Sequence, residues 1–187
     1  RLYKEDIREY DKLKKIFQEN KIDCILHLAA MVGVRTSIVN PFLYEEVNVR
    51  GTLNLLELAR QQNIKKFVFA SSSSIYGNCD KVPFLESDAT NSPISPYAAT
   101  KKMGELLCYA YSHLYKIQTI CLRFFTVYGP CGRPDLAPYK FVDNIAHDKE
   151  IEMYGDGSTT RDYTYISDVV YGILKSLLII NILIFCS

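Results

Sequence analysis

The sequence predicts an α/β fold built on a doubly wound parallel sheet. Short apolar runs are separated by longer segments that have the apolar spacing of helices. Within the runs, apolar residues are nearly continuous and do not alternate with polar ones, which is typical of parallel strands covered on both faces. Small or hydroxyl-bearing residues follow these runs. Because ligands of such sheets bind beyond the carboxyl ends of the strands, we expect a binding crevice there.

The first half of the chain predicts two helices and two strands. Residues 8–19 have the spacing of an amphipathic helix, and the apolar run 22–28 is expected to be a buried strand. Pro41 suits the first turn of a helix, and helical periodicity continues through residues 42–62. Residues 65–71 contain aromatic and β-branched side chains and predict the second strand.

The second half begins with a long helix over residues 96–115 and a third strand over 117–125. The later elements are shorter. We expect, in order, a loop rich in Pro and Gly at 129–138, a helix at 139–148, an extended segment at 151–154, a turn at 155–157, a strand at 160–166 and a last helix capped by Ser167 and Asp168.

Composition excludes several classes of function. The 187 residues are 48% hydrophobic and 23% charged with a net charge of +1, which is ordinary for a globular domain and indicates no nucleic-acid partner. The six cysteines are scattered without C-x-x-C or metal-like His spacing, so no metal is expected and a reducing cytoplasm is favoured over secretion. The polar N-terminus does not resemble a signal peptide.

The C-terminal segment is unusually apolar. Residues 176–186 read SLLIINILIFC, which is too short to span a bilayer that needs about 20 residues. We expect the tail at 176–187 to be a non-native terminus; the alternatives are a buried helix extension or a strand.

Tyr97 and Lys101 form the strongest chemical signal. They lie four residues apart, so their side chains share one helix face roughly 6 Å apart. A nearby ammonium favours phenolate, so a tyrosine with an ordinary pKa of about 10 can act as a base near neutrality. The run Ser71–Ser74 precedes them and can complete a Ser–Tyr–Lys set for proton transfer to or from an alcohol oxygen. The alternative for these serines, stronger at Ser71, is that they satisfy backbone groups at a strand end.

Six ordered motifs carry a resemblance to a known family. They are HLAAMVGVRTS (27–37), VNVRGTLNLLE (47–57), FASSSSIYG (69–77), PYAATKKMGE (96–105), LRFFTVYGPCGRPD (122–135) and RDYTYISDVV (161–170). Together they resemble the extended short-chain dehydrogenase/reductases, which include NAD-dependent nucleotide-sugar epimerases and dehydratases. The resemblance runs from about residue 3 to residue 174 and implies a Rossmann-like sheet. SSSSIYG and RFFTVYGPCGRPD most resemble the UDP-glucuronate 4-epimerase branch.

The resemblance implies a role for each matching residue. Ser72, Tyr97 and Lys101 are the expected catalytic residues, with Tyr97 exchanging the proton of a sugar 4-hydroxyl. The residues expected to contact NAD are Asp6, Ile7, Leu28, Ala29, Ala30, Asn48, Tyr97, Lys101 and Phe124. Those expected to contact a UDP-sugar are Arg35, Ser73, Ser74, Thr126, Arg133 and Arg161, of which the last two are implied for the nucleotide-sugar diphosphate.

The implied reaction is 4-epimerisation of UDP-glucuronate to UDP-galacturonate through a 4-keto intermediate. Dehydratases of this family carry an acid where Ser73 and Ser74 stand, and galactose 4-epimerases carry Asn where Thr126 stands. Short hydroxyls at these positions suit a C5 carboxylate. The alternatives are a UDP-glucuronate decarboxylase, a UDP-glucose/galactose 4-epimerase and a catalytically inert truncated member.

The resemblance also divides the chain. Residues 1–130 correspond to part of an NAD-binding Rossmann domain, and residues 131–175 to part of an interleaved substrate-binding region. The glycine-rich phosphate loop of the family is expected upstream of residue 1, and the C-terminal part of the sugar-nucleotide domain is expected to be missing beyond Ser176. The helices at 41–62 and 96–115 resemble those that pair in family homodimers. No membrane partner is expected; a Golgi-membrane anchor upstream is the alternative to a simple cytoplasmic location.

Overall fold

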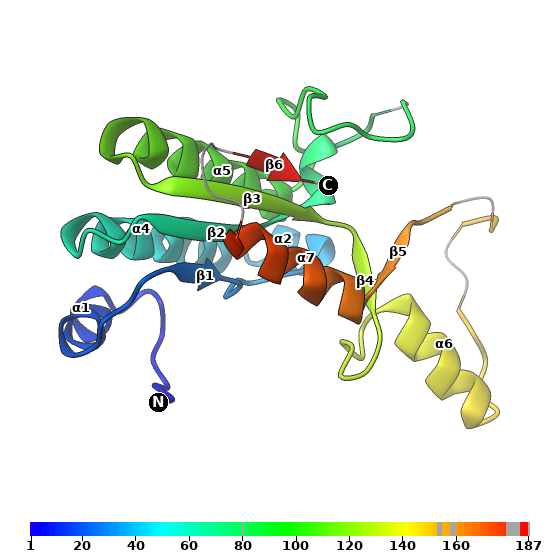
Figure 1. The fold of residues 1–187 in the computed structure, drawn as a ribbon. Helices are drawn as coiled ribbons and strands as arrows, with labels where there is room; N and C mark the ends of the chain where they lie inside the picture. Colours follow the sequence, from blue (N-terminus) through cyan, green and yellow to red (C-terminus); the bar gives the residue numbers. More distant parts are fainter. Residues whose placement is uncertain (80, 153–154, 158–159, 179–183, 187) are drawn as a thin grey trace. The chain divides into compact units, whose positions relative to one another are not determined.

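The computed structural model describes residues 1–187 apart from positions 80, 153–154, 158–159, 179–183 and 187 (Figure 1). The chain forms two compact units. The first comprises Arg1–Phe124 together with Lys175–Ser187, and the second comprises Phe125–Leu174. In the described part of the chain, no helix is long and apolar enough to cross a bilayer.

The first unit is built on a four-stranded sheet in the order β1-β2-β3-β6, and every neighbouring pair is parallel. The predicted α/β class with a parallel sheet is therefore confirmed. β1 is shorter than the expected run 22–28, since only Ile25, Leu26 and His27 of that run pair with β2. The strands are β1 (Ile25–His27), β2 (Lys66–Ser72), β3 (Gln118–Phe124) and β6 (Ile184–Cys186).

The apolar tail supplies the fourth strand. Ser176, Leu177 and Leu178 extend helix α7 (Ile166–Leu178), and Ile184–Cys186 then pair with Ile120–Leu122 of β3. Both structural alternatives for the tail, a helix extension and a strand, are thus realised in successive segments.

Helices connect the strands of the first unit. The 42–62 region is helical as expected but is not one α-helix, since its middle is a π-helical segment, and α2 was not expected. The elements are α1 (Tyr10–Glu19), α2 (Val34–Val39), α3 (Pro41–Tyr44), the π-helix η1 (Glu45–Arg50), α4 (Gly51–Gln61), the 3-10 helix η2 (Ser73–Tyr76) and α5 (Pro96–Tyr115).

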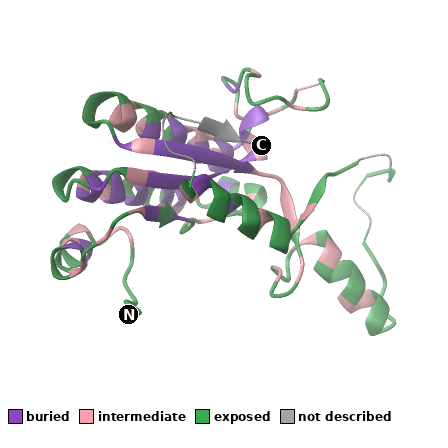
Figure 2. Cartoon of the chain, in the orientation of Figure 1, coloured by how far each residue is buried: buried purple, intermediate pink, exposed green. Residues whose placement is uncertain are grey.

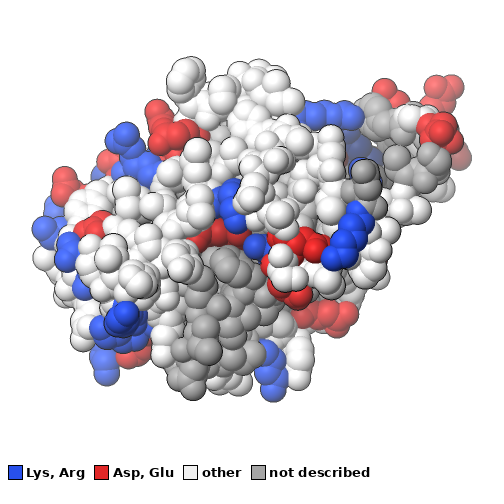
Figure 3. All heavy atoms as spheres, turned by 90° about the horizontal axis from the view of Figure 1, so that it is seen from above, with Lys and Arg blue, Asp and Glu red and all other residues white. Residues whose placement is uncertain are grey.

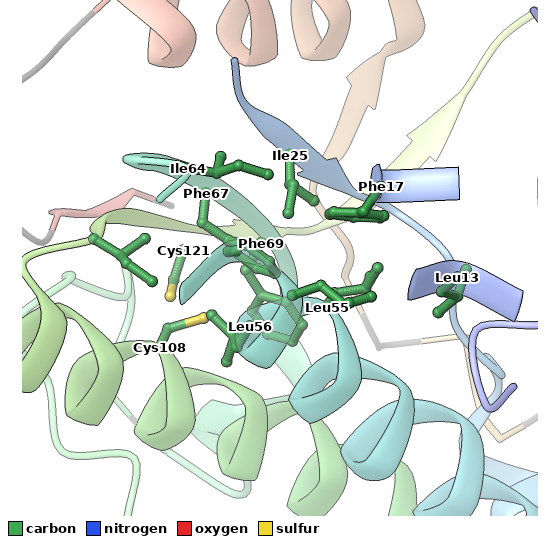
Figure 4. Packing of buried hydrophobic residues seen from close by; sticks show 13 residues of the cluster. Leu13, Phe17, Ile25, Leu55, Leu56, Ile64, Phe67, Phe69, Cys108 and Cys121 are labelled. Carbon is green, nitrogen blue, oxygen red and sulfur yellow. The ribbon is translucent and has the colours of Figure 1, made fainter. Parts of the chain in front are cut away.

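The core of the first unit lies between the sheet and helices α1, α4 and α5 (Figures 2 and 4). Phe67 and Phe69 of β2 are almost fully buried there, beside Leu56 of α4 and Cys108 of α5. Packing is close where α5 crosses β2, because a Cβ added at Gly104 would lie 2.3 Å from Phe69 Cζ. These contacts hold α5 firmly against the sheet.

The second unit contains β4 (Thr126–Tyr128), α6 (Ala137–Ala146), β5 (Tyr163–Tyr165) and most of α7. β4 and β5 pair in parallel, although β4 was expected to be loop or strand end and β5 was expected to cover 160–166. The predicted cap at Ser167 and Asp168 is wrong: α7 begins at Ile166, so Asp168 lies in its first turn, where a negative charge favours the helix dipole. The expected bend at 155–157 is present, whereas residues 153–154 of the expected extended segment lie outside the described residues.

Charged side chains of both signs lie intermixed on the face of the molecule shown in Figure 3.

Candidate functional site

The N-terminus of α5 places Tyr97 at the carboxyl end of the sheet. The hydroxyl of Ser95 accepts a hydrogen bond from the N–H of Ala98 at 3.1 Å, and Pro96 occupies the first turn, so sequence-local capping starts the helix here. Tyr97 is 9% exposed, and its ring meets the ring of Tyr44 edge to face at 6.3 Å. The phenol is therefore held in a partly dry setting.

Lys101 lies one turn further along the same face of α5 and is buried. Its Nζ donates a hydrogen bond to the carbonyl oxygen of Ala70 at 2.7 Å and lies 5.1 Å from the ring centroid of Phe69. Burial lowers the pKa of Lys101 from 10.5 to about 8. At neutral pH the side chain remains mostly protonated, which places a positive charge beside the end of β2.

The serine run divides between structural and candidate catalytic positions. Ser71 Oγ donates to Glu105 Oε1 at 2.8 Å in the interior, which favours the structural interpretation for Ser71. Ser72 is the last residue of β2, and its Oγ accepts from the N–H of Ser74 at 3.2 Å. That bond leaves the hydroxyl proton of Ser72 uncommitted. Ser73 and Ser74 follow in η2 and are half-buried.

Asn48 organises the chain after β1. Its side-chain amide bonds both main-chain groups of Met31, at 2.8 and 3.0 Å, and donates to Thr100 Oγ1 at 3.0 Å. Thr100 in turn donates to the carbonyl of Tyr97 at 2.9 Å. Asn48 was expected to contact NAD, and in the structure its amide links Met31 to α5. The π-helical segment that contains Asn48 is a distortion often found at functional sites.

The residues before Met31 border the carboxyl end of the sheet. Leu28 is 50% exposed, Ala29 is exposed and Ala30 is half-buried. Tyr44 supports the following turn, since its hydroxyl donates to the carbonyl of Val32 at 2.6 Å. Small side chains at 29 and 30, on a segment anchored from both sides, leave room for a flat ligand to approach the backbone.

The two N-terminal candidates have different surroundings. The Asp6 carboxylate receives hydrogen bonds from the side chain and main chain of Arg8, which lower its pKa to about 2. Ile7 packs instead against α4, where a Cβ on Gly51 would lie 2.5 Å from its Cδ1. Ile7 is therefore a packing residue of the first unit, and Asp6 is an exposed, charged neighbour.

Two charged residues of this region were not predicted. Glu105 and Arg123 are 1% and 4% exposed and form an ion pair, with Arg123 Nε 3.0 Å from Glu105 Oε1. Two sequence signals point to them: Glu105 follows Lys101 by four residues on α5, and Arg123 interrupts the apolar run of β3. Phe124, expected near the cofactor, follows Arg123 and aligns with Ser72 of β2.

The remaining substrate candidates are spread over both units. Arg35 lies on α2 in the first unit and is exposed. Thr126 of β4 is half-buried, opposite Tyr163 of β5, in the second unit. The guanidinium of Arg133 bonds both carboxylate oxygens of Asp135, and exposed Arg161 donates to the carbonyl of Thr160 at 2.8 Å.

The second unit contains a pocket of about 410 Å³. Apolar side chains of α6 form much of its wall, and Arg133 supplies a cationic group. The residues around it include Gly129, Gly132, Arg133, Leu136, Tyr139 and Val142. The lining is mostly apolar, and its charged side chains are those of Arg133 and Asp143. Such a cavity suits a ring that carries polar groups.

The first-unit geometry suits proton transfer at an alcohol beside a flat cofactor. Ser72 ends β2, Lys101 Nζ is bonded to Ala70 near that end, and Tyr97 stands one turn before Lys101 on α5. The small residues at 29 and 30 follow β1, which pairs with β2. The donor set fits NAD: a buried ammonium is fixed by Ala70, and Ala29 and Ala30 permit close approach of a dinucleotide.

Comparison with known proteins finds relatives of this chain among nucleotide-sugar epimerases. The chain is 48% identical over 177 residues to UDP-glucuronate 4-epimerase from Thermodesulfobacterium geofontis, covering 95% of this chain and 54% of that protein. The solved UDP-glucuronic acid 4-epimerase from Bacillus cereus, in complex with UDP-glucuronic acid and NAD, is 40% identical with a TM-score of 0.87, covering 97% of this chain and 57% of that one. The UDP-glucose 4-epimerase from Thermotoga maritima, solved with UDP-glucose, is 30% identical with a TM-score of 0.94, covering 99% and 61%.

The chain spans about half the length of the curated relatives it matches. A family model described as the NAD dependent epimerase/dehydratase family matches residues 1–179. The parallel sheet, the ordered motifs and this match lead to one assignment: the chain belongs to the NAD dependent epimerase/dehydratase family.

Proposed function

We propose that this chain forms the proton-transfer part of an NAD-dependent nucleotide-sugar 4-epimerase that converts UDP-glucuronate to UDP-galacturonate. The observation that carries the proposal is the placement of Tyr97, Lys101 and Ser72 at one end of the sheet, with Lys101 buried and fixed by Ala70. The relatives named UDP-glucuronate 4-epimerase support the choice of sugar.

In the proposed reaction, NAD when bound supplies the acceptor and donor of hydride at C4 of the sugar. Tyr97 Oη accepts the proton of the sugar 4-hydroxyl when C4 is oxidised and returns it to O4 when the ketone is reduced. The 4-keto sugar turns in the pocket between these two steps, so that C4 is reduced on its opposite face. The Lys101 ammonium favours the ionised phenol. Ser72 directs its hydroxyl proton to the sugar oxygen, since Ser72 Oγ already accepts from Ser74.

Selection of a uronic acid is proposed to depend on short hydroxyl side chains. Ser73 and Ser74 occupy η2 directly after Ser72. Neither side chain is acidic, so these positions offer no acid for the elimination of water that a dehydratase performs. Hydroxyl donors there suit the C5 carboxylate. A neutral sugar leaves such donors unpaired, which costs on the order of 1–3 kcal/mol for each one. A role for Thr126 rests on the resemblance alone.

The second unit is proposed to hold the nucleotide. Its pocket combines apolar walls with Arg133, whose guanidinium is assigned to the phosphates and would exchange its present partner Asp135 for them. Arg161 is assigned to the diphosphate by resemblance alone.

The proposed assembly is a homodimer formed through α4 and α5. Their outer faces carry large exposed apolar side chains: Leu53, Met103 and Leu106 are 37%, 46% and 57% exposed. Burying such side chains against a second copy removes apolar area from water.

Product analysis tests the proposal. Since the chain spans about half of its relatives, the assay uses a chimera in which this chain replaces the matching segment of the Thermodesulfobacterium geofontis enzyme. The chimera and its parent are each incubated with UDP-glucuronate and with UDP-glucose, and the products are separated by chromatography. We expect UDP-galacturonate from the first substrate and little turnover of the second. Equal use of both substrates indicates a neutral-sugar epimerase, UDP-xylose as the main product indicates a decarboxylase, and a folded but inactive chimera contradicts the proposed function.

A further inference from the structure

The buried ion pair between Glu105 and Arg123 has a forked geometry. Arg123 Nε and Nη2 reach the two carboxylate oxygens of Glu105 at 3.0 and 3.2 Å, deep in the first unit. Burying two charges costs desolvation energy, and apolar side chains of equal volume often stabilise a protein as well or better. The pair is therefore better explained by the geometry it imposes on its neighbours than by its contribution to stability.

On one side, the Glu105–Arg123 pair contacts the serine run Ser71–Ser74. Ser71 Oγ donates to the same Glu105 oxygen that Arg123 Nε reaches, at 2.8 Å. Ser71 and Arg123 also align as neighbours on β2 and β3, so their side chains leave the sheet on the same face. The pair thus holds the residue immediately before Ser72.

On the other side, the pair contacts Tyr76, the last residue of η2. Arg123 Nη1 donates to the Tyr76 hydroxyl at 3.0 Å and to the carbonyl of Glu86 at 3.0 Å. The guanidinium carbon also lies 5.1 Å from the Tyr76 ring centroid, and that ring stacks on Phe84 at 4.7 Å. One guanidinium therefore connects α5, η2 and the 84–86 segment, which the single ammonium of a lysine cannot do.

Ser72, Ser73 and Ser74 lie between these two attachment points. Ser71 is tied at one side and Tyr76 at the other, and both bonds lead to the Glu105–Arg123 pair. Glu105 also stands eight residues after Tyr97 on the inward face of α5, with Lys101 halfway between them. The same helix face therefore holds the proposed base and the group that anchors the serine run.

We propose that Glu105 and Arg123 are positioning residues that set the location of Ser72, Ser73 and Ser74 relative to Tyr97 without touching the substrate. The functional consequence rests on the proposed epimerase activity. The structural part, the restraint of η2, does not depend on that activity.

The structural part is tested on the 187-residue chain by amide hydrogen exchange. Arg123→Lys keeps the charge but loses the fork, and Tyr76→Phe removes only the hydroxyl that binds Arg123. Arg60→Lys is the matched control, because Arg60 Nε and Nη2 reach Glu57 Oε1 and Oε2 in the same forked way on the surface of α4. In both test variants, the amide hydrogens of Ser74 and Gly77 should exchange at least about tenfold faster than in the unmodified chain, while those of Phe69 and Cys121 keep their rates. This pattern is the one that local opening produces. The control should not show it.

An equal change at all four amides in both test variants overturns the proposal, since that pattern means the pair only stabilises the unit. Tyr76→Phe keeps the test decisive if Arg123→Lys does not fold, because the phenylalanine ring can still stack on Phe84.

The functional part is tested in the chimera described above with Glu105→Gln and Arg123→Lys. Displacement of the serine run should lower kcat by about 10- to 100-fold, the scale seen for misplacements near 1 Å. NAD affinity should stay within about twofold, because the segment after β1 is anchored by Asn48 and not by this pair. Unchanged kcat in folded variants contradicts the positioning role. If the unmodified chimera is inactive, the proposed function fails while the exchange result still decides whether the pair restrains η2.

Discussion

Acidification is predicted to destabilise the first unit through His27. This side chain lies at the end of β1, 3% exposed, with its ring near those of Phe67 and Phe69. The Thr52 hydroxyl donates to the carbonyl of Asn48 at 2.5 Å, so it must accept from His27 Nε2–H, which lies 2.9 Å away. Burial and this hydrogen bond therefore favour the neutral imidazole.

The size of the effect follows from the pKa of His27. Burial, with a smaller contribution from the charge of Lys101, lowers this pKa from 6.5 to about 3. The unfolded chain takes up a proton as the pH falls through 6.5, and the folded chain does not do so until about 3. His27 therefore contributes stability that is fully present above pH 6.5 and is lost as the pH falls toward 3. Between pH 8 and pH 5 the loss is about 2 kcal/mol.

The assay measures the free energy of unfolding of the 187-residue chain in urea at several pH values between 8 and 5, with unfolding monitored by circular dichroism. His27→Gln should lose this pH dependence, whereas His113→Gln, which removes an exposed histidine from α5, should retain it. The imidazole proton resonances of His27 should show no titration above pH 5. An identical pH dependence in wild type and His27→Gln, or a His27 titration near 6.5, refutes the reasoning.

Three further predictions concern Lys101 and Gly104 of α5 and Gly172 of α7. Burial lowers the pKa of Lys101 to about 8, so above that pH the unfolded chain binds more protons than the folded chain. The free energy of unfolding should therefore rise by about 2 kcal/mol between pH 7 and 9.5. Lys101→Met should abolish this rise, and an NMR titration midpoint of Lys101 near 10.5 would contradict the prediction. Gly104→Ala should destabilise the chain by about 1–3 kcal/mol in urea unfolding, since the methyl would collide with Phe69. The methyl of Gly172→Ala on α7 would meet nothing within 4 Å, so this substitution should stabilise the chain by about 0.5–1 kcal/mol. If both substitutions change the free energy of unfolding in the same direction, the collision with Phe69 does not decide the effect of Gly104→Ala.

Elements defined by local signals were predicted well. The helix expected at 96–115 has the observed bounds of α5, because Ser95 and Pro96 mark its start within the sequence itself. The long strands β2 and β3 match their apolar runs to within one or two residues. Since α5 and β2 carry Tyr97, Lys101 and Ser72, the candidate catalytic residues could be named before their geometry was known.

Features that depend on distant contacts were not predicted. The π-helical segment around Asn48 accompanies bonds to Met31 and Thr100, 17 and 52 residues away. β4 forms by pairing with β5, far along the chain, and has only three residues to signal it. The Glu105–Arg123 pair was missed for the same reason: a charged residue on a helix or strand ordinarily faces water, and only the fold reveals that these two meet in the interior.

The central claim is that Tyr97 is the proton acceptor, and the direct measurement is single-turnover conversion of UDP-glucuronate by the chimera carrying Tyr97→Phe. Tyr109→Phe is the control, because Tyr109 lies on the same helix with 57% exposure and loses only its hydroxyl. We expect Tyr97→Phe to slow turnover at least about 100-fold, the scale of a lost general base, while UDP binding is retained. Turnover by Tyr97→Phe at the rate of the Tyr109→Phe control would contradict the claim.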